Sequence, residues 1–146
     1  MDNGFTPRTF ASPDGLTLYA RDYGLQLDDT VPIVCLAGLT RNSRDFHQLA
    51  LFLSRDAARP RRVLTLDYRG RGESDRDHNK ANYNLLVEAQ DVIAACEAFG
   101  IDRADFIGTS RGGLILHLLA AMRPALLRRI VLNDIGPRIE TEGLKQ

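Results

Sequence analysis

Short, largely apolar runs alternate with longer amphipathic stretches along most of this 146-residue chain. Four of the runs have the length and composition of β-strands, and the first of them suits a strand buried on both faces of a sheet. These runs are residues 31–36, 62–66, 104–107 and 130–132. Strands that alternate with helices along a chain are usually parallel and joined by right-handed crossovers. The pattern therefore predicts an α/β fold with helices on both faces of a parallel sheet.

Helix boundaries are marked by residues of suitable conformation. Ser43 and Asn84 can each accept a hydrogen bond from a backbone N–H of a following helix, so both are expected N-caps. Gly100 is placed to end the second of these helices in a left-handed conformation. Residues 114–119 predict a third, strongly apolar helix, which ends before Pro124 because proline breaks the helical hydrogen-bond pattern.

The start of the chain has a different pattern of side chains from the rest. Residues 9–11 and 16–19 alternate apolar and polar side chains and flank the turn sequence Ser-Pro-Asp-Gly at residues 12–15. Such a turn between two short strands predicts an opening antiparallel β-hairpin. Residues 73–82 contain few apolar side chains and predict a loop between the second parallel strand and the second helix.

The most informative motif is Gly-Thr-Ser-Arg-Gly-Gly at residues 108–113. It follows a predicted strand and opens a predicted helix, and its small residues allow the sharp turn that exposes a serine hydroxyl at the carboxyl edge of a sheet. A helix N-terminus beneath the serine also favours negative charge at that point. The context predicts a nucleophile elbow with Ser110 at its tip.

Two further segments lie where predicted strands end. Residues 35–40 read Cys-Leu-Ala-Gly-Leu-Thr, and residues 67–74 read Asp-Tyr-Arg-Gly-Arg-Gly-Glu-Ser. Gly70 and Gly72 alone are compatible with a phosphate-binding loop, but the third glycine of that motif and a P-loop lysine are missing. With the elbow, in this order, the segments resemble the serine branch of the α/β-hydrolase superfamily, over nearly the whole chain.

The resemblance implies roles for individual residues. Ser110 would be the nucleophile, and the backbone N–H groups of Leu39 and Arg111 would form the oxyanion hole. Ala37 stands where the family usually has histidine, but a backbone donor does not depend on that side chain. Asp134 is a possible catalytic acid, although most members of the family place the acid one strand later. The alternative is that Ser110 is a tight-turn residue in a scaffold without catalytic activity.

A catalytic histidine is not found at the position that the family order of Ser, acid and His requires. His47, His78 and His117 are interpreted as surface or packing residues, and His117 lies ~10 Å along the helix from Ser110. We expect the base beyond Gln146, with residues 1–137 forming the N-terminal part of the hydrolase core. Residues 138–146 resemble the start of a truncated cap. The sheet is then incomplete and has an open apolar edge.

The composition of the chain argues against some classes of binding partner. Lys+Arg and Asp+Glu balance at 19 each, so no basic field for nucleic acid or membrane is predicted. The basic clusters at residues 59–62 and 128–129 are interpreted as solvated helix ends or strand entries. No signal-like or membrane-spanning apolar run is present, and the two cysteines lack metal-ligand spacing, so we expect buried, reduced thiols in a cytoplasmic protein.

The functional prediction is a serine hydrolase that acts by acyl transfer on a small-molecule ester, lactone or related carbonyl compound. This mechanism needs neither a metal nor an organic cofactor. A related enzymatic alternative is an acyltransferase or cofactor-free haloperoxidase that uses the same serine. The non-enzymatic alternative is a half-domain that pairs with another chain through its open sheet edge.

Overall fold

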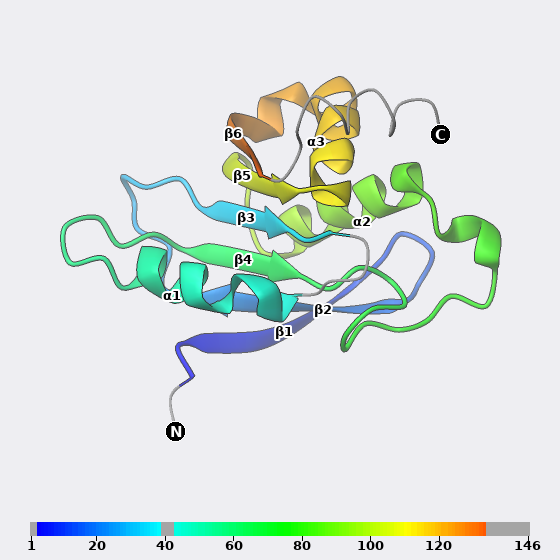
Figure 1. Cartoon of the computed structure of the whole chain (residues 1–146), viewed down its shortest axis with the longest axis horizontal. Helices are drawn as coiled ribbons and strands as arrows, with labels where there is room; N and C mark the ends of the chain where they lie inside the picture. Colours follow the sequence, from blue (N-terminus) through cyan, green and yellow to red (C-terminus); the bar gives the residue numbers. More distant parts are fainter. Residues whose placement is uncertain (1–2, 39–42, 134–146) are drawn as a thin grey trace.

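The computed structural model describes residues 3–38 and 43–133, which contain a mixed six-stranded sheet (Figure 1). The strands lie in the order β1-β2-β4-β3-β5-β6. Their bounds are Phe5–Ala11 for β1, Thr17–Tyr23 for β2, Ile33–Leu36 for β3, Val63–Leu66 for β4, Ala104–Thr109 for β5 and Leu127–Asn133 for β6. The parallel strands are those predicted from the apolar runs, although β6 begins earlier than its apolar core.

Strand directions divide the sheet into two parts. β1 and β2 form the predicted hairpin, and β2 also pairs with β4 in the antiparallel sense. Strands β4, β3, β5 and β6 are mutually parallel. The predicted order, an antiparallel hairpin followed by parallel strands, is thus confirmed. The carboxyl ends of the four parallel strands meet at one edge of the sheet.

Helices cover both faces of the sheet. The α-helices are His47–Ser54 (α1), Leu85–Ala98 (α2) and Arg111–Met122 (α3), and short 3-10 helices span Ser43–Phe46, Lys80–Asn82 and Pro124–Leu126. Phe5 contacts His47 of α1, whereas Phe10 contacts Phe99 at the end of α2. Because Phe5 and Phe10 are an odd number of residues apart on β1, they point to opposite faces. α1 and α2 therefore lie on opposite sides, with α3 beside α2 (Figure 1).

Of the two predicted N-caps, the one at Asn84 is confirmed and the one at Ser43 is wrong. Asn84 accepts a hydrogen bond from the Val87 N–H at 2.9 Å, and Gly100 has the expected positive φ of 70°. Ser43 does not cap α1, which begins four residues later after a 3-10 turn. The Ser43 N–H instead donates to the Asp67 carboxylate at 2.7 Å, a long-range contact that satisfies this backbone donor.

The hydrophobic core is continuous across the middle of the sheet. All side chains of β3 and β4 are buried, and both cysteines are buried and free, as predicted. The outer strand β6 differs, since Ile130, Val131 and Leu132 are 42%, 57% and 45% exposed. An apolar edge strand of this kind agrees with the predicted partial sheet.

The basic cluster at residues 59–62 is less solvated than predicted. Arg61 contacts Asp105 and the Val31 carbonyl, and Arg62 contacts Asp22 and the Phe99 carbonyl. Arg61 links the starts of β3 and β5, and Arg62 links the end of β2 to the end of α2; their position before a strand does not reveal these contacts. Within the described ranges, no helix has the length and apolar character needed to cross a membrane.

Candidate active site

Ser110 occupies a strained turn between β5 and α3. Its φ and ψ are 52° and −107°, and no other non-glycine residue among those that the structure describes has a positive φ. Such a conformation costs about 1–3 kcal/mol and persists only where the surrounding structure enforces it. Ser110 is also exposed, so the hydroxyl at the tip of the turn is accessible. This geometry is that of the predicted elbow.

Close backbone packing holds the elbow in place. A Cβ atom at Gly112 would meet the carbonyl group of Leu36, at the end of β3. One at Gly108 would lie 2.8 Å from the Gly112 carbonyl carbon and the Gly113 nitrogen. The two glycines therefore allow α3 to start directly against β5 and β3, and this contact fixes the direction of the turn.

The backbone on both sides of the Ser110 side chain differs in its hydrogen bonding. Arg111 is the first residue of α3, and a first-turn N–H has no acceptor within its own helix. The Ser110 N–H donates to the Asn133 carbonyl at 3.3 Å, which brings the end of β6 beside the elbow. The other expected donor, Leu39, and the possible acid, Asp134, lie outside the described residues.

The three histidines lie away from the elbow or are engaged elsewhere. His47 Nδ1 is 2.7 Å from the hydroxyl of Tyr23, and His117 Nδ1 is 2.8 Å from the Gly113 carbonyl. His78 is exposed in the polar loop. No hydrogen bond between Ser110 and a histidine is present within residues 3–38 and 43–133.

An open groove of about 630 Å³ runs beside the elbow on the α1 face. Its walls are mainly apolar, and it is bordered by Gly38 and by Thr109, the residue before Ser110 in the sequence. The remaining lining residues are Ala37, Asp45, Phe46, Leu49, Ile107, Val131 and Asn133. The groove therefore connects the elbow with the exposed face of β6.

The second glycine motif forms a turn at the same edge of the sheet. The Asp67 carboxylate accepts hydrogen bonds from the Ser43 N–H at 2.7 Å and the Glu73 N–H at 2.9 Å. Gly72 has a φ of 47°, and a side chain there would collide with Asp67. The motif is thus a structural turn around a buried carboxylate, which agrees with the preferred interpretation over a nucleotide site.

Arg69 is the centre of a charged cluster behind this turn. Its buried guanidinium donates to Asp14 in the hairpin turn, Asp77 in the polar loop and Asp91 in α2, at 2.7 to 2.9 Å. The hydrogen bond from Arg69 lowers the pKa of Asp14 below its usual range. Three segments that are distant in the sequence are joined in this way.

Sequence reasoning missed two contacts next to the expected oxyanion hole. The Tyr68 hydroxyl donates to the Ala37 carbonyl at 2.7 Å, and the Arg111 Nε donates to the buried Glu88 carboxylate at 2.6 Å. A signal for the second contact exists in the sequence. Glu88 is one position before Ala89 and four before Val92, so it falls on the apolar face of its helix, where a carboxylate requires a partner.

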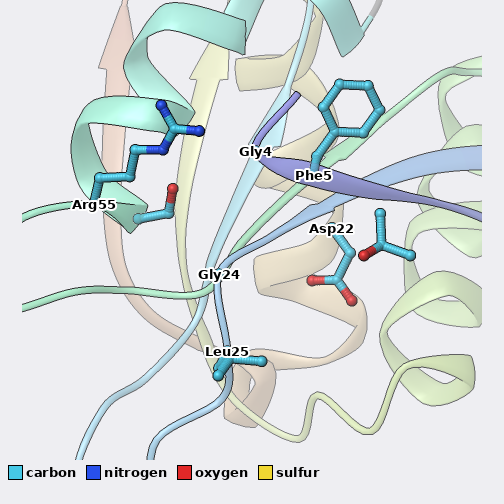
Figure 2. A pocket seen from close by; sticks show the side chains of 8 residues that line it. Gly4, Phe5, Asp22, Gly24, Leu25 and Arg55 are labelled. Carbon is cyan, nitrogen blue, oxygen red and sulfur yellow. The ribbon is translucent and has the colours of Figure 1, made fainter. Parts of the chain in front are cut away.

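Other candidate sites fit less well. Burial raises the pKa of the Cys35 thiol to about 12, which disfavours the reactive thiolate. A recess of about 270 Å³ lies near Gly4, Asp22 and Arg55 (Figure 2), and the Asp22 carboxylate in it contacts Arg8 and Arg62. Because Tyr23 at the end of β2 pairs with the first residue of β4, this recess lies at the edge opposite Ser110.

Comparison with known proteins agrees with this geometry. A family model described as the alpha/beta hydrolase fold matches residues 31–143. A 3-hydroxybutyrate-oligomer hydrolase of Cupriavidus necator is 32% identical over 92% of this chain and 45% of its own length. An esterase of Escherichia coli is 34% identical over 73% of this chain and 39% of its own length.

Solved structures show the same relationship. An alpha/beta hydrolase from Novosphingobium aromaticivorans superimposes with a TM-score of 0.83 at 43% identity, over 92% of this chain and 45% of that protein. A putative acyltransferase from Salmonella enterica has a TM-score of 0.78 at 27% identity, over 98% of this chain and 46% of its own. The chain thus spans less than half the length of these relatives.

Proposed function

We propose that the protein carrying this chain, which belongs to the α/β-hydrolase family, is a serine hydrolase acting by acyl transfer. The observation that carries the proposal is the exposed Ser110 held at a φ of 52° between β5 and α3. Strain of this kind has no structural benefit by itself, and it concentrates at functional positions.

The proposed reaction has two halves. The Ser110 Oγ attacks the substrate carbonyl carbon while a base takes the hydroxyl proton, and the carbonyl oxygen becomes an oxyanion. The intermediate then expels the alcohol, which receives the proton from the base. Water attacks the acyl-serine in the same manner, and the acid product leaves as Ser110 regains a proton.

The oxyanion is stabilised in this scheme by two backbone donors. The Arg111 N–H at the start of α3 is one, and the Leu39 N–H is the other. Losing one oxyanion donor typically costs about 3–4 kcal/mol of activation free energy. The dipole of the 12-residue helix α3 adds to the effect, because its positive end lies beneath Ser110.

The base is proposed to be a histidine outside the described residues, oriented by an acid. Asp134 remains a candidate for that acid, because the preceding Asn133 accepts the Ser110 N–H. The relatives extend to more than twice the length matched here, so either group can lie in a further part of the same polypeptide.

The proposed substrate class is a small ester or lactone. The names of two relatives, an esterase and a hydrolase of 3-hydroxybutyrate oligomers, support an ester bond as the target. The open apolar groove beside Ser110 supports an apolar acyl or alcohol group. Water is proposed as the acyl acceptor, with an alcohol or thiol acceptor as the acyltransferase alternative.

A turnover assay tests this function. The full-length natural polypeptide is incubated with p-nitrophenyl butyrate, a 3-hydroxybutyrate dimer and a γ-lactone, with and without an added alcohol acceptor. We expect the wild type to release the acid product, and we expect the rate of release to be at least about a thousandfold lower in the Ser110→Ala variant. Turnover that survives in this variant would remove Ser110 from the reaction, and ester formation that exceeds hydrolysis would favour the acyltransferase.

The exposed β6 edge favours a second candidate function, in which this half-domain pairs with another chain. Ile130, Val131 and Leu132 lie together on this outer strand and are at least two-fifths exposed. Size-exclusion chromatography with light scattering on the isolated 146-residue chain tests this idea. A stable dimer that Val131→Lys returns to monomer supports pairing through β6, whereas a monomer at high concentration contradicts it.

A further inference from the structure

The end of β3 is held by a contact that the family resemblance does not explain. The sheet pairing of β3 ends where Leu36 lies opposite Gly108, so the next carbonyl, that of Ala37, is beyond the ladder. Ala37 is buried, and its carbonyl accepts the Tyr68 hydroxyl at 2.7 Å. Because a buried carbonyl without a partner is destabilising, this hydrogen bond fixes the orientation of the peptide group after Ala37.

Tyr68 is itself held rigidly. The side chain is only 4% exposed, and burial raises the pKa of its hydroxyl, which keeps it protonated as a donor. On one side Asp67 accepts two backbone N–H groups, and on the other Arg69 donates to three carboxylates. The side chains on both sides of Tyr68 in the sequence are therefore held by hydrogen bonds and ion pairs.

A second contact fixes the other side of the elbow. The Glu88 side chain is 3% exposed and accepts the Arg111 Nε at 2.6 Å. Glu88 belongs to the first turn of α2, so it connects the start of that helix to the start of α3. The charge of Glu88 raises the pKa of the Tyr68 hydroxyl, and the charge of Arg111 lowers it.

We propose that Tyr68 and Glu88 are positioning residues, which fix the backbone at residues 37–38 and at Arg111 on either side of the Ser110 hydroxyl. The proposal rests on the proposed function, because these two segments lead into the oxyanion donors. An oxyanion hole stabilises a transition state only if its donors are already oriented. A small displacement of either segment therefore slows the chemical step and leaves substrate binding nearly unchanged.

The test compares variants of the full-length natural polypeptide with p-nitrophenyl butyrate as substrate and an alkyl trifluoromethyl ketone as transition-state analogue. Tyr68→Phe removes only the hydroxyl. We expect kcat to fall about tenfold, KM to stay within about twofold, and the affinity for the ketone to fall in parallel with kcat/KM. Tyr83→Phe is the matched control, because its hydroxyl accepts the Asp77 N–H in the polar loop at 2.6 Å.

Glu88 is tested by Glu88→Ala and by the conservative Glu88→Gln, whose amide oxygen still accepts a hydrogen bond from Arg111. We expect a loss of kcat in the alanine variant and recovery of most of it in the glutamine variant. Glu97→Ala is the matched control, because Glu97 is exposed in the same helix and contacts Arg123 only at 3.5 Å. If Glu88→Ala does not fold, Tyr68→Phe still decides the proposal.

Three results would overturn the proposal. Unchanged kcat and ketone affinity in a folded Tyr68→Phe variant would contradict it directly. Equal losses in Tyr68→Phe and Tyr83→Phe would indicate a general structural effect. The third result is full turnover in Ser110→Ala, which would refute the proposed serine mechanism and the positioning roles with it. If Ser110→Ala loses activity but Tyr68→Phe keeps the kcat of the wild type, the positioning proposal fails while the proposed function stands.

Discussion

The elbow after β5 and the polar turn after β4 lie at the same edge of the sheet but are stabilised differently. Backbone sterics hold the elbow, where Gly108 and Gly112 allow α3 to pack directly on two strands. Charged side chains hold the polar turn, where Arg69 joins three carboxylates from distant segments. The elbow needs small residues at fixed spacing, whereas the turn needs particular partners elsewhere in the chain.

This difference has consequences for function. A steric arrangement resists substitution at a few glycines and keeps Ser110 in a strained conformation. An ionic cluster tolerates changes at exposed members but not at its buried centre, because removing one partner leaves the others uncompensated. We therefore expect the two regions to fail under different substitutions, which the first three of the following four predictions test.

Arg69→Met is expected to have the largest effect on stability. The substitution leaves Asp91 buried opposite an apolar side chain and removes the link between the hairpin turn, the polar loop and α2. We expect the free energy of unfolding to fall by about 3–5 kcal/mol. Urea denaturation measures this free energy. The control is Arg76→Met at an exposed position, and its free energy of unfolding should change by less than about 0.5 kcal/mol. Equal effects of the two substitutions would contradict the account of this cluster.

Gly112→Ala tests whether close backbone packing stabilises the elbow. The added Cβ would overlap the Leu36 carbonyl, which the β3–β5 pairing prevents from moving. We expect a loss of about 3 kcal/mol in the free energy of unfolding, at the upper end for overpacking. Gly100→Ala is the control, since no atom lies within 4 Å of its added Cβ and only the positive φ opposes it. Its cost should be about 1 kcal/mol.

Ser110→Gly should separate stability from function. Glycine adopts a φ of 52° without steric penalty, so we expect the variant to be more stable than wild type by about 1 kcal/mol. The adjacent Thr109→Gly, at a position without positive φ, should be less stable by a similar amount. A Ser110→Gly variant that melts below wild type would show that the serine conformation is not strained.

Acid titration should reveal the smallest effect, at the opposite edge of the sheet. Hydrogen bonds from Arg128 and Arg61 lower the pKa of Asp105 to about 2, below its unfolded value of about 3.9. Its stabilising contribution is therefore complete above pH ~4 and lost as the pH falls towards 2. We expect Asp105→Asn to cost about 1 kcal/mol at pH 6 and little at pH 2. A cost independent of pH would contradict this assignment.

The two regions also differ in how far the sequence predicts them. The elbow and the parallel strands follow from local signals, namely apolar runs, glycine spacing and the strand-turn-helix order. The partners of Arg69 do not, because any of many aspartates could reach a buried arginine once the chain is folded. The same reason explains why the contact between Tyr68 and Ala37 was missed, since it joins residues 31 positions apart.

Ser43 illustrates a different limit of sequence reasoning. Its side chain suits an N-cap, yet tertiary structure directs its backbone N–H to Asp67 and inserts a 3-10 turn before α1. Leu39 and Asp134 lie outside the described residues, so their proposed roles stay predictions. The fold class was thus predictable in outline, and so was the turn that carries Ser110, whereas the side chains that support this turn were not.

Chemical labelling tests the central claim, that the strained elbow presents Ser110 as a nucleophile, most directly. The full-length natural polypeptide is treated with a fluorophosphonate probe, and the modified peptide is identified by mass spectrometry in wild type and in Ser110→Ala. We predict one adduct, on the Ser110 hydroxyl, and no labelling of the variant. An adduct on another residue, or undiminished labelling of Ser110→Ala, would contradict the assignment of the nucleophile.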